Sequence, residues 1–205
     1  MPALPYRTFI AIELPSNIRQ AIRQHIDQLR AAFPDVRASW TREDNLHLTL
    51  KFLGNVPVTS IPALSNAVAD AAQTIDPFEL VVSGCGTFPP HGRPKVLWIG
   101  AGSADVSSAS SQAPSPNLLH PLIFFHTALE DHCAAANFER EPRPYHPHLT
   151  IARLRESRDS RTLAEHHKHL GFPARTFTAS ELVVFRSELS SKGSKHTALA
   201  RHELG

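Results

Sequence analysis

The chain has 205 residues, of which 41% are hydrophobic and 20% charged, and its formal net charge is +2 at pH 7. This composition is typical of a globular protein that buries a substantial core, and it argues against a disordered chain. The length suits one domain. The mild positive charge permits an anionic ligand without requiring nucleic acid.

Two further observations concern the compartment in which the protein acts. No apolar run reaches the roughly 18 residues that a membrane helix needs, and the N-terminal residues lack the pattern of a secretion signal. Cys85 and Cys133 are far apart in sequence and do not have metal-ligand spacing. We therefore expect a cytoplasmic protein with reduced, structural cysteines and no contact with a membrane.

The first part of the chain alternates between strand-like and helical patterns. Residues 6–14 are rich in β-branched and aromatic side chains, which is typical of a strand. Ile18 and Ile22 begin a run of apolar residues at steps of three and four, which predicts a helix that ends at Pro34. In chain order we then expect strands over 36–40 and 45–53, a turn at Gly54-Asn55, a helix over 60–75, strands over 78–83 and 95–101, and a long Gly- and Pro-rich loop over 84–94.

Residues 102–117 are dominated by Ser, Ala and Pro, which predicts a flexible insertion. Beyond it we expect a helix over 118–136, a strand over 148–154, a helix over 159–170 that Gly171 ends, and strands over 177–185 and 195–204. Because similar elements recur on both sides of the insertion, we predict an α+β fold. It is a single domain over 1–205 with two pseudo-symmetric lobes of mainly antiparallel sheet, roughly 1–101 and 118–205, with flanking helices around a central cleft, and strands could exchange between the lobes.

The phrase His-Leu-Thr occurs twice, at His47–Thr49 and at His148–Thr150, each time inside a strand-like run. A strand points residues i and i+2 to the same side, roughly 6.5–7 Å apart along the backbone. Each copy therefore presents an imidazole and a hydroxyl on one face. If the two copies face each other, they supply two proton carriers and two hydroxyl donors, which suits a phosphate site that needs no metal.

Histidine has an unperturbed pKa of about 6.5, so it can give or take a proton near neutral pH. One histidine could take a proton from an attacking water while the other gives a proton to the leaving oxygen. The threonines could bind the non-bridging phosphate oxygens, whose charge grows in the transition state. A 2',3'-cyclic phosphate suits such a site, because its ring holds the leaving oxygen in place.

Several other polar residues are weaker candidates. Strand parity places Lys51 on the face of His47, where it could bind phosphate, whereas Arg153 has the opposite parity to His148 and could reach the site only from the strand end. Lys51 could equally be a solvated surface cation, and for Arg153 that is the favoured interpretation. Three histidines, His166, His167 and His169, share a short predicted helix, and the i, i+3 pair of His166 and His169 could touch a metal. A solvated face is the favoured interpretation, because no constellation of cysteines or carboxylates with metal-ligand spacing supports a site there. We therefore expect no metal and no cofactor.

Five stretches carry a family resemblance: RTFIAIELP, NLHLTLKFLG, GTFPPHGRPKVLWIG, PHLTIAR and ELVVFRSELSSKGSKHTAL. With these stretches in this order, the chain resembles the 2H phosphoesterase superfamily. Within it, the chain is most similar to the bacterial RNA 2',3'-cyclic phosphodiesterases, also called 2'-5' RNA ligases. Members of this family often have a tyrosine where His196 stands here, so the role of that ring stays open.

The resemblance implies metal-independent hydrolysis of a terminal RNA 2',3'-cyclic phosphate to a 2'-phosphate. It implies that His47 is the proton donor and His148 the proton acceptor that activates water, while Thr49 and Thr150 hold the phosphate. Some members also form 2'-5' linkages by the reverse reaction. The expected partner is RNA or an oligonucleotide with a cyclic-phosphate end, bound by a monomer. The alternatives are a cyclic phosphodiesterase for small nucleotides, a non-catalytic RNA-binding module and, more distantly, a metallohydrolase built on the helix histidines.

Overall fold

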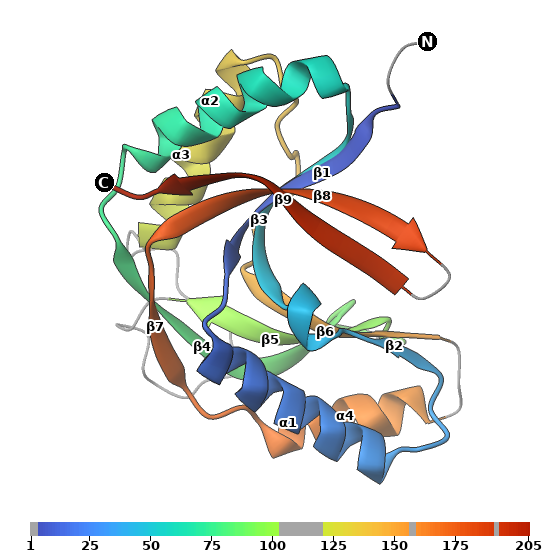
Figure 1. The fold of residues 1–205 in the computed structure, drawn as a ribbon. Coiled ribbons are helices and arrows are strands. Elements are labelled where there is room, and N and C mark those ends of the chain that lie inside the picture. Colours follow the sequence, from blue (N-terminus) through green and yellow to red (C-terminus); the bar gives the residue numbers. More distant parts are fainter. Residues whose placement is uncertain (1–3, 103–120, 156–158, 191–192) are drawn as a thin grey trace.

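The computed structural model describes residues 4–102, 121–155, 159–190 and 193–205. Its strands form two antiparallel sheets (Figure 1). The four-stranded sheet has the order β3 (His47–Val56), β1 (Tyr6–Glu13), β8 (Glu181–Ser190) and β9 (Gly193–Glu203). The five-stranded sheet has the order β2 (Ala38–Trp40), β6 (His148–Leu154), β5 (Val96–Gly102), β4 (Phe78–Phe88) and β7 (Arg175–Ala179). The predicted α+β class with antiparallel sheets is confirmed.

Two pairs of helices enclose the sheets (Figure 1). Helices α2 (Ile61–Ala72) and α3 (Pro121–Ala135) pack together beside the four-stranded sheet, and α1 (Ser16–Ala32) and α4 (Ser160–Leu170) lie against the five-stranded sheet. The apolar positions that predict these helices are the buried ones: Ile18, Ile22, Ile26 and Leu29 on α1, and Leu122, Phe125, Leu129 and Cys133 on α3. Within the described ranges, no helix is long and apolar enough to cross a membrane.

Each sheet takes strands from both halves of the sequence. The four-stranded sheet combines β1 and β3 with β8 and β9, and the five-stranded sheet combines β2, β4 and β5 with β6 and β7. In addition, α1 follows β1 directly but packs against α4 on the other sheet. The ranges 1–101 and 118–205 therefore do not delimit the two sheets. Most of the predicted insertion at 102–117 lies outside the described residues.

Three predicted boundaries are wrong, each for a structural reason. The expected turn at Gly54-Asn55 lies inside β3, where both residues pair with β1. The expected loop begins later than 84, because β4 continues to Phe88 through a register shift at Gly84, whose φ of +70° suits glycine. The single strand expected over 177–185 is two strands, since the chain leaves one sheet at Ala179 and enters the other at Glu181.

Candidate active site

The two His-Leu-Thr phrases begin β3 and β6, which contact each other although they belong to different sheets (Figure 1). Both strands have the same burial pattern over their first seven residues: the histidine and threonine are half-buried and the leucine between them is fully buried. Tyr145, just before β6, donates a hydrogen bond of 3.1 Å to the carbonyl of Thr49 on β3. The two predicted halves of the site are therefore neighbours.

Each strand is irregular immediately after its threonine. Opposite β1, the partner changes from Thr49 to Lys51 and skips Leu50; opposite β5, it changes from Thr150 to Ala152 and skips Ile151. Such a bulge adds one residue to one strand and reverses the facing of those that follow. The bulges decide where Lys51 and Arg153 lie.

Lys51 does not share the face of His47, so the prediction from strand parity is wrong. Its ammonium is buried against α3 and the segment that follows this helix. It donates to both carboxylate oxygens of Glu130, at 2.9 and 2.7 Å, and to the carbonyl of Glu139 at 2.7 Å. The side chains of Lys51 and Glu130 are only 2% and 8% exposed. This pair joins β3 to α3 and leaves Lys51 unavailable to a phosphate.

Ala152 occupies the position in β6 that Lys51 occupies in β3, and Arg153 is the exposed residue that follows it. Its charge acts on His148 and contributes to the lowering of that residue's pKa. The expected opposite parity is therefore also overturned by the bulge, and Arg153 is close enough to influence the site electrostatically.

The two histidines are held in the same orientation. Nδ1 of His47 lies 2.8 Å from the carbonyl of Asn45, and Nδ1 of His148 lies 2.7 Å from the carbonyl of His146. A carbonyl oxygen can only accept, so we infer that Nδ1 donates in both rings. In the neutral imidazole this leaves the lone pair on Nε2, which can accept a proton and, once protonated, give it back.

The surroundings of His47 are aromatic. Phe9 stacks on the ring at a centroid distance of 4.7 Å, and His196 lies at 5.2 Å in an edge-on arrangement. Burial, and then the charge of His196, lower the pKa of His47 to about 4, against the opposing effect of the Asn45 carbonyl. His196 therefore lies beside the candidate proton donor, in the strand where the sequence left its role open.

His148 has a different aromatic neighbourhood, made by Phe88 at 4.9 Å and Trp98 at 6.5 Å between ring centroids. Burial lowers the pKa of His148, the hydrogen bond to the His146 carbonyl opposes this, and the charges of His146 and Arg153 add to the lowering. The indole Nε1 of Trp98 is buried and has no hydrogen-bond partner among the described residues. The Trp98 ring lies against Gly86, where any Cβ would overlap it.

The threonines are fixed through their backbone carbonyls. Tyr145 donates to the carbonyl of Thr49, as described, and the Thr41 hydroxyl donates to the carbonyl of Thr150 at 2.8 Å. Both hydroxyl donors come from segments outside the two strands. Sequence reasoning missed them because neither lies in a motif. Together they hold each threonine in place at the start of its bulge.

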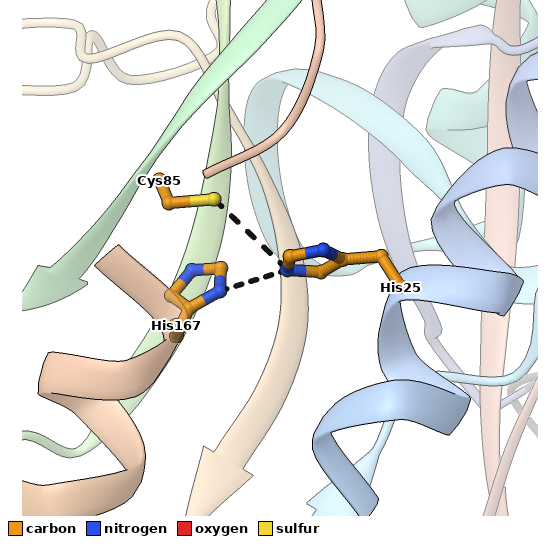
Figure 2. A group of neighbouring side chains, drawn as sticks. All are labelled: His25, Cys85 and His167. Atoms are coloured by element: carbon orange, nitrogen blue, oxygen red, sulfur yellow. Dashed lines mark hydrogen bonds between the residues drawn. The ribbon is translucent and has the colours of Figure 1, made fainter. Parts of the chain in front are cut away.

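The histidines of α4 do not form one solvated face. His166 and His169 are exposed, but His167 is fully buried and lies beside His25 of α1 and Cys85 of β4 (Figure 2). Burial lowers the pKa of both His25 and His167 to about 4, and it raises the pKa of Cys85 to about 12. In the part of the chain that the structure describes, these three side chains are the group with metal-ligand geometry.

A comparison with protein families matches residues 12–98 and 114–195, which include both His-Leu-Thr strands, to the LigT-like phosphoesterases. The chain belongs to the LigT-like phosphoesterase family. It is 29% identical over 192 residues to an RNA 2',3'-cyclic phosphodiesterase of Methanothermobacter thermautotrophicus, covering 93% of this chain and 95% of that relative.

Two other members of the family give a consistent result. A Geobacillus stearothermophilus RNA 2',3'-cyclic phosphodiesterase is 28% identical over 197 residues; 96% of this chain matches, but the match spans 57% of that relative's length. The crystal structure of Escherichia coli LigT complexed with 3'-AMP superposes with a TM-score of 0.65 at 26% identity, covering 98% of this chain and 99% of that one. The family expected from the sequence is confirmed.

Proposed function

We propose that the protein hydrolyses the terminal 2',3'-cyclic phosphate of RNA or of oligonucleotides to a 2'-phosphate. The observation that carries this proposal is the matched presentation of two imidazoles. In His47 and His148, Nδ1 is bonded to a backbone carbonyl, so Nε2 is the atom that can exchange a proton with substrate. The substrate class is supported by the relatives, which are RNA 2',3'-cyclic phosphodiesterases, and by a LigT structure that holds 3'-AMP.

In the proposed reaction, Nε2 of His148 takes a proton from a water molecule as the water oxygen bonds to phosphorus. The bond from phosphorus to the 3' oxygen breaks, and protonated Nε2 of His47 gives its proton to that oxygen. The products are a 2'-phosphate and a 3'-hydroxyl. Proton exchange with solvent then restores both rings. These proton transfers need no metal ion or cofactor.

The hydroxyls of Thr49 and Thr150 are proposed to donate to the non-bridging phosphate oxygens. Both side chains alternate with the same buried leucines as the histidines, so they share the histidines' side of each strand. Donors placed where negative charge develops stabilise the transition state more than the ground state. Arg153 is proposed to add a cation near the site, whereas Lys51 is excluded from this role by its buried pairing with Glu130.

The first experiment measures hydrolysis of a short RNA that ends in a 2',3'-cyclic phosphate. The His47→Ala and His148→Ala variants should each lose about 10²–10⁴-fold in kcat, the usual contribution of a general acid or base. His169→Ala is the matched control, because it removes an exposed histidine of α4 and should retain full activity. Substantial activity in both His47→Ala and His148→Ala would refute the proposal.

Product analysis tests the direction of cleavage. A 2'-phosphate agrees with the proposed leaving oxygen, and a 3'-phosphate would reverse the roles of the two histidines. Binding of the RNA without any product would instead indicate a non-catalytic RNA-binding module, and hydrolysis confined to mononucleotides would indicate a small-nucleotide enzyme. Activity should also survive EDTA; loss that added metal restores would contradict a metal-independent mechanism.

The same assay can test 2'-5' ligation. Supplying a second RNA with a 5'-hydroxyl end offers an alternative to water as the attacking group. His148 would take the proton of the 5'-hydroxyl as its oxygen bonds to phosphorus, and His47 would protonate the leaving 3' oxygen, so the product would carry a 2'-5' linkage. A joined product that resists cleavage specific for 3'-5' linkages would establish the reaction.

The proposed site is made by residues of one chain, so it is compatible with the expected monomer. Sedimentation of the purified protein checks this directly. We also keep the expectation of a cytoplasmic location, which agrees with Cys85 and Cys133 being free thiols.

A further inference from the structure

Three potential metal ligands that belong to neither His-Leu-Thr strand converge on one point. His25 comes from α1, Cys85 from β4 and His167 from α4 (Figure 2). One ligand atom from each lies within 4.8 Å of the other two. Nε2 of His25 is 3.0 Å from Nδ1 of His167 and 4.0 Å from Sγ of Cys85. The side chains therefore point at a common centre, although no two of them are neighbours in sequence.

The two separations from Nε2 of His25 are close to those of a tetrahedral zinc site. With Zn–N bonds of about 2.0–2.1 Å and a Zn–S bond of about 2.3 Å, tetrahedral angles place two nitrogens about 3.3 Å apart and a nitrogen and sulfur about 3.6 Å apart. The His25–His167 pair would have to open by about 0.3 Å, and the His25–Cys85 pair would have to close by about 0.4 Å. Side-chain rotation can supply such shifts without moving the backbone.

The second ring nitrogen of His167 is already held as it is in metal sites. Its Nε2 lies 3.0 Å from the carbonyl of Trp98, to which it donates. This leaves the lone pair on Nδ1, the atom that faces His25. Metal-bound histidines usually donate their other N–H to a backbone carbonyl or carboxylate, which fixes the ring and its tautomer.

The position of Cys85 also depends on a backbone feature. Its register with β5 shifts immediately before it, at Gly84, whose φ is +70°. A glycine bulge of this kind re-aims the following side chain. Without the shift, Cys85 would have the opposite facing on β4. The sheet is therefore irregular at the point that brings the thiol to the two imidazoles.

We propose that Nε2 of His25, Sγ of Cys85 and Nδ1 of His167 bind one Zn²⁺ ion that fastens α1 and α4 to β4. Two imidazoles and a thiolate suit Zn²⁺ and related transition metals, and they do not suit Ca²⁺ or Mg²⁺, which prefer oxygen ligands. Three protein ligands leave one tetrahedral position for water. The ion has a structural role and takes no part in phosphate hydrolysis.

The proton balance of binding is defined. Without metal, His25 donates its Nε2 proton to Nδ1 of His167, because His167 uses its own proton toward Trp98. On binding, the proton of His25 moves from Nε2 to Nδ1, so neither imidazole changes its charge. The thiol of Cys85 becomes a thiolate and releases one proton. Binding should therefore release one proton per ion and weaken as the pH falls.

The test uses Co²⁺ as a spectroscopic substitute for Zn²⁺ on the full chain after dialysis against EDTA. A site with a thiolate should take up one Co²⁺ per chain and give a sulfur-to-cobalt charge-transfer band together with tetrahedral d–d bands, all removed by adding Zn²⁺. The thiolate band should disappear in Cys85→Ser and persist in Cys133→Ser, which alters the other free cysteine. Absence of the band in the wild-type protein, or its survival in Cys85→Ser, would overturn the proposal.

Thermal unfolding gives a second readout that does not depend on spectroscopy. Zn²⁺ at 100 times its Kd should raise the Tm of the wild-type and Cys133→Ser proteins by roughly 5–10 °C. The Cys85→Ser protein should show a much smaller rise. Equal rises in the Cys85→Ser and Cys133→Ser proteins would show that the ion binds elsewhere. The hydrolysis assay is separate, since the proposed reaction does not require this ion, and the two proposals can fail independently.

Discussion

Replacing Lys51 by methionine removes one partner of a buried ion pair while keeping a similar chain length. The ammonium makes three hydrogen bonds of 2.7–2.9 Å, two to Glu130 and one to the carbonyl of Glu139, and its side chain is 2% exposed. The substitution leaves the Glu130 carboxylate buried without its cation. An unpaired buried charge of this kind costs about 3–5 kcal/mol.

This cost is large enough to measure in several ways. In a domain of this size, about 1 kcal/mol lowers Tm by roughly 2–4 °C, so Lys51→Met should lower it by roughly 6–20 °C. Removing the carboxylate as well, in the double variant Lys51→Met/Glu130→Leu, should recover much of the loss, because well-packed apolar residues often replace a buried ion pair at little cost. The single variant Glu130→Leu completes the cycle, and equilibrium unfolding of the wild type and the three variants in urea gives the coupling between the two residues.

The same variants distinguish a structural lysine from a phosphate-binding one. Because Lys51 lies on the opposite face of β3 from His47, the fraction of Lys51→Met that is folded should hydrolyse cyclic phosphate with a nearly unchanged KM. If Lys51→Met instead raises KM strongly and leaves Tm unchanged, the ammonium reaches the substrate and our account of the bulge after Thr49 is wrong.

Four further predictions concern the surroundings of the two histidines. Gly86→Ala should destabilise the protein by about 1–3 kcal/mol and lower kcat/KM, because the new Cβ overlaps the Trp98 ring; unchanged urea unfolding would contradict this. Tyr145→Phe should cost about 1 kcal/mol in urea unfolding, because it removes the hydroxyl bonded to a β3 carbonyl. Burial holds the pKa values of His47 and His148 below 6.5. A profile of kcat/KM against pH should therefore have both of its limbs below pH 6.5 and should already be falling at that pH. In His196→Phe the limb that belongs to His47 should move to higher pH, because a neighbouring positive charge is lost.

Local sequence patterns predict the elements that local physics determines. The strand over 148–154 has the predicted bounds, because Pro147 has no N–H to continue the ladder and the apolar alternation begins at His148. The helix over 160–170 ends at Gly171, whose positive φ of 65° suits a glycine. The candidate histidines and threonines could be found for the same reason, since a two-residue period places both on one face of a strand.

The facing of Lys51 and Arg153 could not be predicted in this way. Each follows a bulge whose extra residue, Leu50 or Ile151, is an ordinary apolar residue of a strand. Pairing with the neighbouring strand creates the bulge, and no residue of the motif itself marks it. One extra residue is enough to reverse every later side chain. The parity argument therefore holds up to the threonine and fails directly after it.

The cluster of His25, Cys85 and His167 shows a second limit. The two histidines are 142 positions apart, and the cysteine is 60 positions from the nearer one. Metal motifs can be recognised in sequence when their ligands share a turn or a helix face. The i, i+3 spacing of two histidines on α4 is a pattern of that kind. A set assembled from two helices and a strand becomes visible only when the packing of α1 against α4 is known.

We propose different roles for the two histidines, with His47 as the proton donor and His148 as the proton acceptor. This difference cannot come from their own hydrogen bonds, which are alike. In the free protein the pKa of His47 is held at about 4, which opposes a role as proton donor. A bound phosphate places negative charge beside both rings and raises both pKa values. Next to His148, the positive charge of Arg153 counteracts that rise. The residue whose charge acts on His47 is His196. Burial lowers the pKa of His196 and so disfavours its charged form, which means that it opposes the rise less than Arg153 does. Bound substrate should therefore favour the protonated form of His47 over that of His148. In a plot against pH, the limbs of kcat should lie at higher pH than those of kcat/KM. The proton donor is thus formed only when the anion is bound.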